Sequence, residues 1–182
     1  LHCSSSRLAA LCIVFAMQVP QAAKETLPGV SNYTRLDATL ACGGAPSVEA
    51  LAELKRRGFV TVINLQMARE PNARIEAEGQ DVRNAGLRYL SMPLNPSPGA
   101  DVAEAVEGLL KAIAAPVNQP VFLHSVASHR AGAVWLIKRM LRDGWSPEQA
   151  VMEAETSGLS DHTVYWNQMQ QFALDYVKTH PR

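Results

Sequence analysis

The apolar positions of the chain follow two alternating patterns, one typical of helices and one typical of buried strands. Ser47 can cap a helix that buries Leu51 and Leu54, and Gly58 can end this helix in a left-handed conformation. Residues 59–65 then form a nearly continuous apolar run. Such a run is typical of a strand that is buried on both faces, as in a parallel sheet.

The same pattern of helix, glycine and strand occurs a second time. Residues 75–85 have helical spacing, and residues 87–92 have the pattern of the strand that follows. The proline-rich residues 93–99 predict a loop, residues 101–114 a third helix, and residues 121–124 a short buried strand. This alternation predicts an α/β fold with a central, mainly parallel sheet flanked by helices.

Helical patterns fill the remainder of the chain. Residues 131–142 have helical spacing, and Ser146 and Gln149 are placed as the two ends of a capping box that opens another helix. A last helix is predicted over residues 160–177. No linker-like segment interrupts residues 46–177, so we expect one domain.

The first 23 residues have the pattern of a secretory signal. Arg7 is their only fixed charge, and residues 8–17 form an apolar run that is too short to span a bilayer. Small residues just before Lys24 suit cleavage, while a buried apolar helix is the alternative interpretation. We expect residues 1–23 to be removed and residues 24–182 to form an exported domain, periplasmic or secreted, without a stable membrane span.

The composition is that of an ordinary globular domain, with 47% hydrophobic and 19% charged residues. Lys and Arg total 17, as do Asp and Glu, so no net basic field attracts nucleic acid or an anionic membrane. Removal of the signal would leave Cys42 as the only cysteine, without a partner for an internal disulfide. Asp161 and His162 lack the spacing of a metal site, and we expect neither a metal nor another cofactor.

The most informative segment joins the strand that ends at His124 to the helix that opens at Arg130. Only residues 125–129 lie between them. In an open α/β sheet, ligands bind where a strand runs into a helix, because free backbone N–H groups and the helix dipole converge there. Arg130 adds a fork of donors that fits phosphate or sulfate. The segment is therefore a candidate oxyanion site, with an ordinary turn and a solvated arginine as the alternative.

Residues 121–135, Val-Phe-Leu-His-Ser-Val-Ala-Ser-His-Arg-Ala-Gly-Ala-Val-Trp, resemble the active-site segment of cysteine-dependent protein tyrosine phosphatases, in which a strand ends in His-Cys and a loop closes on Arg. They are similar, more closely, to a small bacterial phosphatase-like family related to the amino-terminal part of beta-lactamase-hydrolase-like proteins. That family has four residues between Cys and Arg, as this chain has between Ser125 and Arg130. Family-like phrases at residues 44–47, 55–65, 85–89 and 144–150 extend the resemblance over about residues 30–159.

The resemblance implies a three-layer, tyrosine-phosphatase-like fold and a loop that binds a phosphate group on a small molecule or a protein. His124 would shape this loop. Asp101 would protonate the leaving oxygen, although a carboxylate so close to a helix start has an equally good role as a cap. The residues of the phosphate-binding loop would be Ser125, Val126, Ala127, Ser128, His129 and Arg130.

Two positions depart from the family pattern. Ser125 stands where the family has its nucleophilic cysteine, and a hydroxyl is far more basic than a thiol, so the loop cannot ionise it at neutral pH. Ser128 stands where the family tends to have glycine, and a side chain disfavours positive φ. We expect a pseudophosphatase that binds its ligand with lost or weak turnover. We interpret Ser125 as natural, because an engineered substrate trap is usually made without a secretory signal.

Three alternatives stay open at this point. Ser125 would be the nucleophile of an active phosphoester hydrolase if His124 or His129 served as its base and a third group held that base. A rhodanese-like sulfur carrier has an equally short loop, but its persulfide chemistry needs a thiolate. The domain would otherwise serve only to bind a partner or to support a larger structure.

Overall fold

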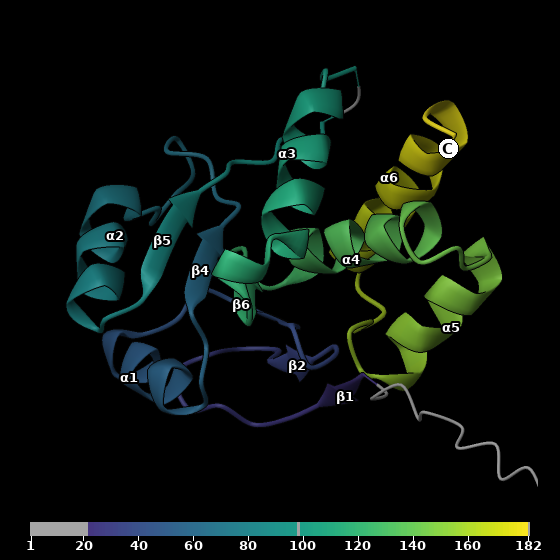
Figure 1. The fold of residues 1–182 in the computed structure, drawn as a ribbon. Helices are drawn as coiled ribbons and strands as arrows, with labels where there is room; N and C mark the ends of the chain where they lie inside the picture. Colours follow the sequence, from purple (N-terminus) through teal and green to yellow (C-terminus); the bar gives the residue numbers. More distant parts are fainter. Residues whose placement is uncertain (1–21, 98, 182) are drawn as a thin grey trace, which may run out of the picture.

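A computed structural model describes residues 22–97 and 99–181 of the chain. Residues 1–21, and with them most of the expected secretory signal, lie outside the described residues. The expected boundary after residue 23 falls within the first strand, β1, which is the edge of the sheet (Figure 1).

A mixed, mostly parallel sheet of six strands forms the centre of the molecule, with the order β1-β2-β3-β6-β4-β5 (Figure 1). Strands β3, β6, β4 and β5 are parallel, whereas β1 and β2 add an antiparallel edge. β6 lies between β3 and β4, which places its carboxyl end near the middle of the sheet. The strands are β1 (Ala23–Lys24), β2 (Thr34–Arg35), β3 (Leu40–Gly43), β4 (Thr61–Asn64), β5 (Arg88–Ser91) and β6 (Val121–His124).

Helices cover both faces of this sheet (Figure 1). One apolar core joins α1 and α2 to one face, and a larger core joins α3, α4, α5 and α6 to the other. The result is the α/β architecture of helix, sheet and helix layers that the sequence predicts. The helices are α1 (Val48–Arg56), α2 (Ile75–Asn84), α3 (Ala103–Ala114), the 3-10 turn η1 (Pro116–Asn118), α4 (His129–Leu141), α5 (Pro147–Thr156) and α6 (Val164–Thr179).

Local signals in the sequence account for several element ends. Ser47 accepts the backbone N–H of Ala50 as the cap of α1, and Gly58 takes a φ of +85° after it. The capping box at Ser146 and Gln149 is present. These predictions are confirmed because each depends on residues only a few positions apart.

Other ends differ from the predictions by a few residues. The strand predicted over residues 59–65 spans Thr61–Asn64, and the N–H groups of Val60 and Leu65 extend the pairing to Pro120 and His124. Phe59 lies outside the strand because its N–H bonds to Leu54 in the last turn of α1. The last helix begins at Val164 rather than at residue 160, because Thr163 provides its cap. The site loop also ends earlier than predicted, since α4 begins at His129.

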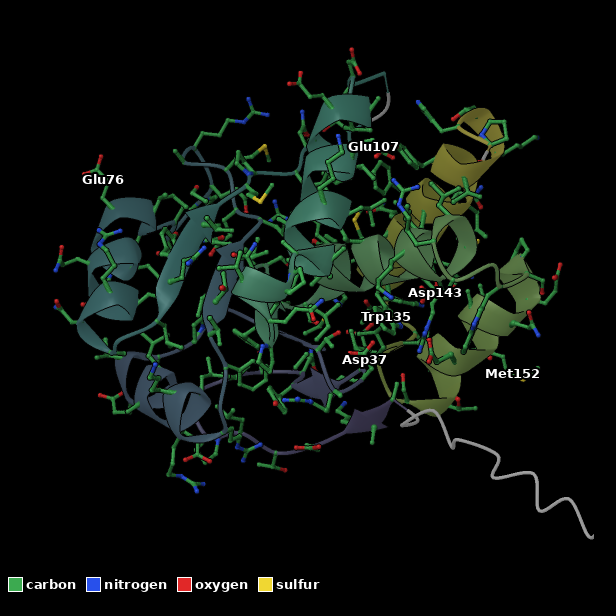
Figure 2. All side chains as sticks on the ribbon, viewed as in Figure 1. Asp37, Glu76, Glu107, Trp135, Asp143 and Met152 are labelled. Atoms are coloured by element: carbon green, nitrogen blue, oxygen red, sulfur yellow. The ribbon has the colours of Figure 1, made fainter. Side chains whose placement is uncertain are left out.

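A charged cluster is buried where α4 packs on α5. Arg139 lies between the rings of Trp135 and Trp145, with its guanidinium carbon 4.2 Å from each ring centre. Glu153 accepts two hydrogen bonds from Arg139 and one from the Trp135 indole N–H. Figure 2 shows Trp135 and Asp143 in this region, whereas Met152 on α5 points away from the molecule. The cluster holds α4 against α5, because the buried charge of Arg139 on α4 is paired with Glu153 on α5.

Candidate oxyanion-binding site

The loop after β6 lies at the carboxyl ends of the parallel strands and leads directly into α4. Its outer side is fastened to the segment before α1. The carbonyl of Val126 accepts the N–H of Ala45 at 3.4 Å, and the carbonyl of Ala127 accepts the Asn32 side-chain amide at 3.2 Å. Gly44 forms an isolated bridge with Ala127. The loop conformation is therefore held by residues far from it in the sequence.

Several backbone amides of the loop and of the first turn of α4 are free donors. Among the described residues, the N–H groups of Val126, Ala127, His129 and Arg130 have no hydrogen-bond acceptor. The last two belong to the first turn of α4, a helix of 13 residues, so the positive end of its dipole adds to them. Unpaired amides at such a position bind anions.

Arg130 stands beside these amides in a fixed orientation. Its Nη1 and Nη2 donate to the two carboxylate oxygens of Glu70, at 2.7 and 2.6 Å. Nη1 also donates to the carbonyls of Leu65 and Leu94. The Nε–H has no acceptor among the described residues, so the edge of the guanidinium that carries Nε and the second Nη2 proton can still receive an oxyanion.

Glu70 is a site residue that the sequence analysis did not find. Its side chain is 14% exposed and also accepts the N–H of Met67 at 2.7 Å. Partial burial raises the pKa of Glu70, but the hydrogen bonds from Arg130 and Met67 outweigh burial and leave it below its usual value. Glu70 therefore holds Arg130 as a carboxylate. It lies in a segment without periodicity, where nothing local marks its role.

Ser125 and Ser128 lie inside the loop. Ser125 is 2% exposed, and its N–H faces the Gly43 carbonyl at 3.4 Å. Ser128 has a φ of +79°, the left-handed conformation that favours glycine. Its hydroxyl is buried and has no partner among the described residues. The predicted conflict between a serine side chain and positive φ is thus present at Ser128.

The Nε2 atom of His124 contacts Glu78 on α2. The imidazole is fully buried, stacks on Phe122, and its Nε2 lies 2.7 Å from Glu78. Glu78 also accepts the side-chain amide of Asn64, which in turn reaches Tyr89. Burial and the nearby Glu78 raise the pKa of Tyr89 to about 12. This network holds the end of β6, and no hydrogen bond joins His124 to Ser125, while His124 Nδ1 is buried without a partner among the described residues.

His129 forms a pair that the sequence analysis did not predict. Its Nε2 lies 2.8 Å from Asp161, and its ring stacks on Tyr165 with the centres 6.3 Å apart. Partial burial raises the pKa of Asp161, but the hydrogen bonds from His129 and Thr163 prevail and lower it to about 2. Asp161 also accepts two hydrogen bonds from Thr163 at the start of α6 through its other oxygen.

These groups meet in one cavity of about 420 Å³. Within the part of the chain that the structure describes, no cluster of His, Cys, Asp and Glu could hold a metal ion. The lining therefore offers amides, Arg130 and His129 to an anion. It consists of Met67, Glu70, Asn95, Pro96, Ser97, Ser125, Val126, Ala127, His129, Arg130, Tyr165 and Met169.

Asp101, the expected proton donor, is not among the lining residues. Its side chain is exposed, and its Oδ1 accepts the N–H of Ala103 at 3.3 Å at the start of α3. Asp101 thus lies one residue before Val102, the N-cap of α3, and its proton-donor role stays a prediction. No described helix is both long and apolar enough to cross a bilayer.

Solved structures share this fold. TpbA of P. aeruginosa is 25% identical, with a TM-score of 0.66 over 88% of this chain and 91% of that chain. A cysteine-to-serine variant of TpbA in complex with phosphotyrosine is 23% identical, with a TM-score of 0.66 over 90% and 97% of the two chains. A candidate phosphatase (DUF442) from Shewanella putrefaciens CN-32 is 24% identical, with a TM-score of 0.67 over 86% and 97%.

A comparison of the sequence with family models points in the same direction. No curated protein matches the sequence. The family model described as "DSP-PTPase phosphatase fused to NAD+ kinase" matches residues 17–171, which is most of the chain. The match includes the whole loop between β6 and α4 and the helix that follows it. The chain therefore belongs to this DSP-PTPase family, within the superfamily of cysteine-dependent, protein tyrosine phosphatase-like proteins.

Proposed function

We propose that the chain binds the phosphate group of a phosphorylated small molecule or protein in the loop of residues 125–130, and that it hydrolyses this ligand weakly or not at all. The observation that carries the proposal is the set of unpaired amides at Val126, Ala127, His129 and Arg130. They lie next to the free Nε–H edge of a guanidinium that Glu70 holds in place. Together these groups supply several donors to one tetrahedral anion.

The low turnover follows from the residue at the nucleophilic position. A cysteine there would be ionised by the helix terminus and by Arg130, but a serine hydroxyl stays protonated at neutral pH. No described base lies within hydrogen-bond distance of the Ser125 hydroxyl. Ser125 would then donate a hydrogen bond to the bound phosphate rather than attack it. The phosphotyrosine complex of the TpbA variant supports a phosphorylated ligand for this fold.

Anion-dependent thermal unfolding tests the binding proposal. Orthophosphate or tungstate at about 100 times its dissociation constant stabilises the folded chain by about 2.7 kcal/mol, which raises Tm by about 5 °C or more. Arg130→Ala should lose this shift. Arg130→Lys keeps a charge for Glu70 but lacks the fork, and it should lose most of the shift even if Arg130→Ala fails to fold. No shift in the parent chain would refute binding.

A matched control is Arg56→Ala. Arg56 lies on α1 with 74% of its side chain exposed, so its removal lowers the net charge equally without touching the loop. This variant should keep the whole anion-dependent shift. Loss of the shift in Arg56→Ala would mean that the anion acts through the overall charge of the protein.

The turnover proposal is tested with 4-nitrophenyl phosphate. The parent chain should show no turnover above background, and Ser125→Cys should gain it, because a thiolate would then face the bound phosphorus. Parent turnover that Ser125→Ala abolishes would instead establish an active serine hydrolase.

We also propose that the protein is exported after cleavage near residue 23. Mass spectrometry of the protein from its native host would reveal the mature amino terminus.

A further inference from the structure

The cavity contains a second polar group besides the loop and Arg130. His129 lies at the rim, with a side chain that is 17% exposed, and it shares the cavity with Ser125 and Arg130. The ring is held on two sides, by Asp161 at Nε2 and by Tyr165 in a stacked contact. An imidazole that is fixed in this way is suited to transfer a proton at its remaining nitrogen.

Asp161 is a rigid support for this ring. Its Oδ1 accepts both the backbone N–H and the hydroxyl of Thr163, at 3.1 and 2.7 Å, which leaves Oδ2 for His129. Because Nε2 is directed to Asp161, the free ring nitrogen is Nδ1, which has no partner among the described residues.

The charged and titratable groups around His129 come from four elements. Arg130 is its neighbour in α4, Tyr165 is on α6, Asp161 precedes α6, and Glu70 comes from the segment before α2. Arg130 forms a bidentate pair with Glu70 and keeps its Nε–H edge free. His129 and Tyr165 are the described aromatic lining residues that carry a transferable proton, and of the two His129 is the one whose ring is held by a hydrogen bond, from Nε2 to Asp161.

We propose that His129, positioned by Asp161, is the proton donor of this site, and that its Nδ1–H is directed to the ester oxygen of a bound phosphomonoester. This proposal rests on the proposed phosphate-binding function and adds the group that recognises the ester side of the ligand. In the parent chain the contact is a hydrogen bond and no covalent bond changes. Asp161 acts as a positioning residue, and Asp101 has no part in the transfer.

The donor becomes measurable when a thiolate is placed opposite it. In Ser125→Cys, the sulfur attacks phosphorus, an S–P bond forms and the P–O ester bond breaks. The electron pair leaves with the ester oxygen, which takes the proton from Nδ1 of His129. Water then attacks phosphorus, the S–P bond breaks, and the water proton returns to His129, so that thiolate, protonated imidazole and inorganic phosphate result.

The experiment compares two leaving groups in the Ser125→Cys background. Phenyl phosphate has a basic leaving oxygen that needs a proton, whereas 2,4-dinitrophenyl phosphate leaves as a stable anion. His129→Gln should lower kcat for phenyl phosphate by about 100-fold, the usual contribution of general acid catalysis, and change kcat for the dinitrophenyl ester by less than about 3-fold. His162→Gln removes an exposed imidazole on the same connecting segment and should change neither rate.

Asp161→Asn tests the positioning role with the same two esters. Loss of the carboxylate releases the His129 ring, so kcat for phenyl phosphate should lose most of the donor's contribution of about 100-fold, while kcat for the dinitrophenyl ester should change by less than about 3-fold. Asp161→Glu, which keeps a carboxylate, should recover part of the loss. A merely structural role for Asp161 would lower kcat for both esters equally, and such an equal loss would overturn the assignment of Asp161.

Further outcomes separate this proposal from phosphate binding itself. Equal losses for both esters in His129→Gln, or a selective loss for phenyl phosphate in Asp101→Asn, would overturn the assignment of His129. An orthophosphate-dependent rise in Tm without any turnover by Ser125→Cys would also overturn it, while leaving the binding function intact. No rise in Tm would remove the proposed function first.

Discussion

The left-handed conformation of Ser128 leads to a prediction about stability. Its φ of +79° costs an L-residue about 1–2 kcal/mol relative to glycine. Its hydroxyl is buried without a described partner, which costs about 1–3 kcal/mol. Ser128→Gly removes both penalties but gives the unfolded chain more freedom, which costs about 0.4–1 kcal/mol. With the lower ends of the two penalties and the upper end of the unfolded-chain cost, the variant should gain at least about 1 kcal/mol.

Thermal unfolding of the parent chain, Ser128→Gly and Ser128→Ala measures these effects separately. For a chain of 182 residues, a gain of about 1 kcal/mol raises Tm by about 2–4 °C. Ser128→Ala removes the hydroxyl but keeps the strained backbone, so it should gain less than Ser128→Gly. Asn72, at a φ of +64° in an exposed loop, is a control, because asparagine tolerates this conformation and Asn72→Gly should change Tm little. If Ser128→Gly were no more stable than Ser128→Ala, the inferred backbone strain would be absent.

Three further predictions concern stability. Glu153→Ala leaves the guanidinium of Arg139 buried with one of its carboxylate partners missing. The free energy of unfolding, measured with urea, should therefore fall by about 3–5 kcal/mol. An unchanged free energy of unfolding would contradict this pairing. Gly132→Ala should cost about 1–3 kcal/mol in the same assay, because its Cβ would lie 2.6 Å from the Trp166 ring; a neutral result would show that the ring moves freely. Because the pKa of Asp161 is lowered from 3.8 to about 2, its stabilisation of up to about 2 kcal/mol should be complete above about pH 5 and fade as the pH falls toward 2. The difference in unfolding free energy between the parent chain and Asp161→Asn should shrink over that range, and a difference independent of pH would argue against the lowered pKa.

The elements of the fold were predictable because their signals are local. The capping serines, the glycine after α1 and the apolar runs of the strands depend on residues within one or two turns of each other. The ends that were misplaced, such as the start of α6 at Val164, depend on which of several polar residues provides the cap. Ser160, Asp161 and Thr163 are all residue types that cap helices well, so the spacing of apolar residues does not show which of them is the N-cap of α6.

The candidate site was predictable in its location but not in its partners. The step from β6 to α4, the place of Arg130 and the glycine-like conformation of Ser128 follow from the order of residues and from the resemblance to phosphatases. The expected role of Asp101 rested on that resemblance alone. The structure brings His129, with Asp161 behind it, to the cavity. This pair could not be predicted, because its two members lie in separate segments.

Sequence order alone is sufficient to place a strand, a short loop and a helix start next to one another, because these features follow from hydrogen bonds and apolar spacing over a few residues. It does not say which distant side chains meet. Glu70 is 60 residues from Arg130, Glu78 is 46 from His124, and Asp161 is 32 from His129. Each pair forms because the sheet and its helices bring separate segments together, and a buried charge or imidazole is stable there only with its partner.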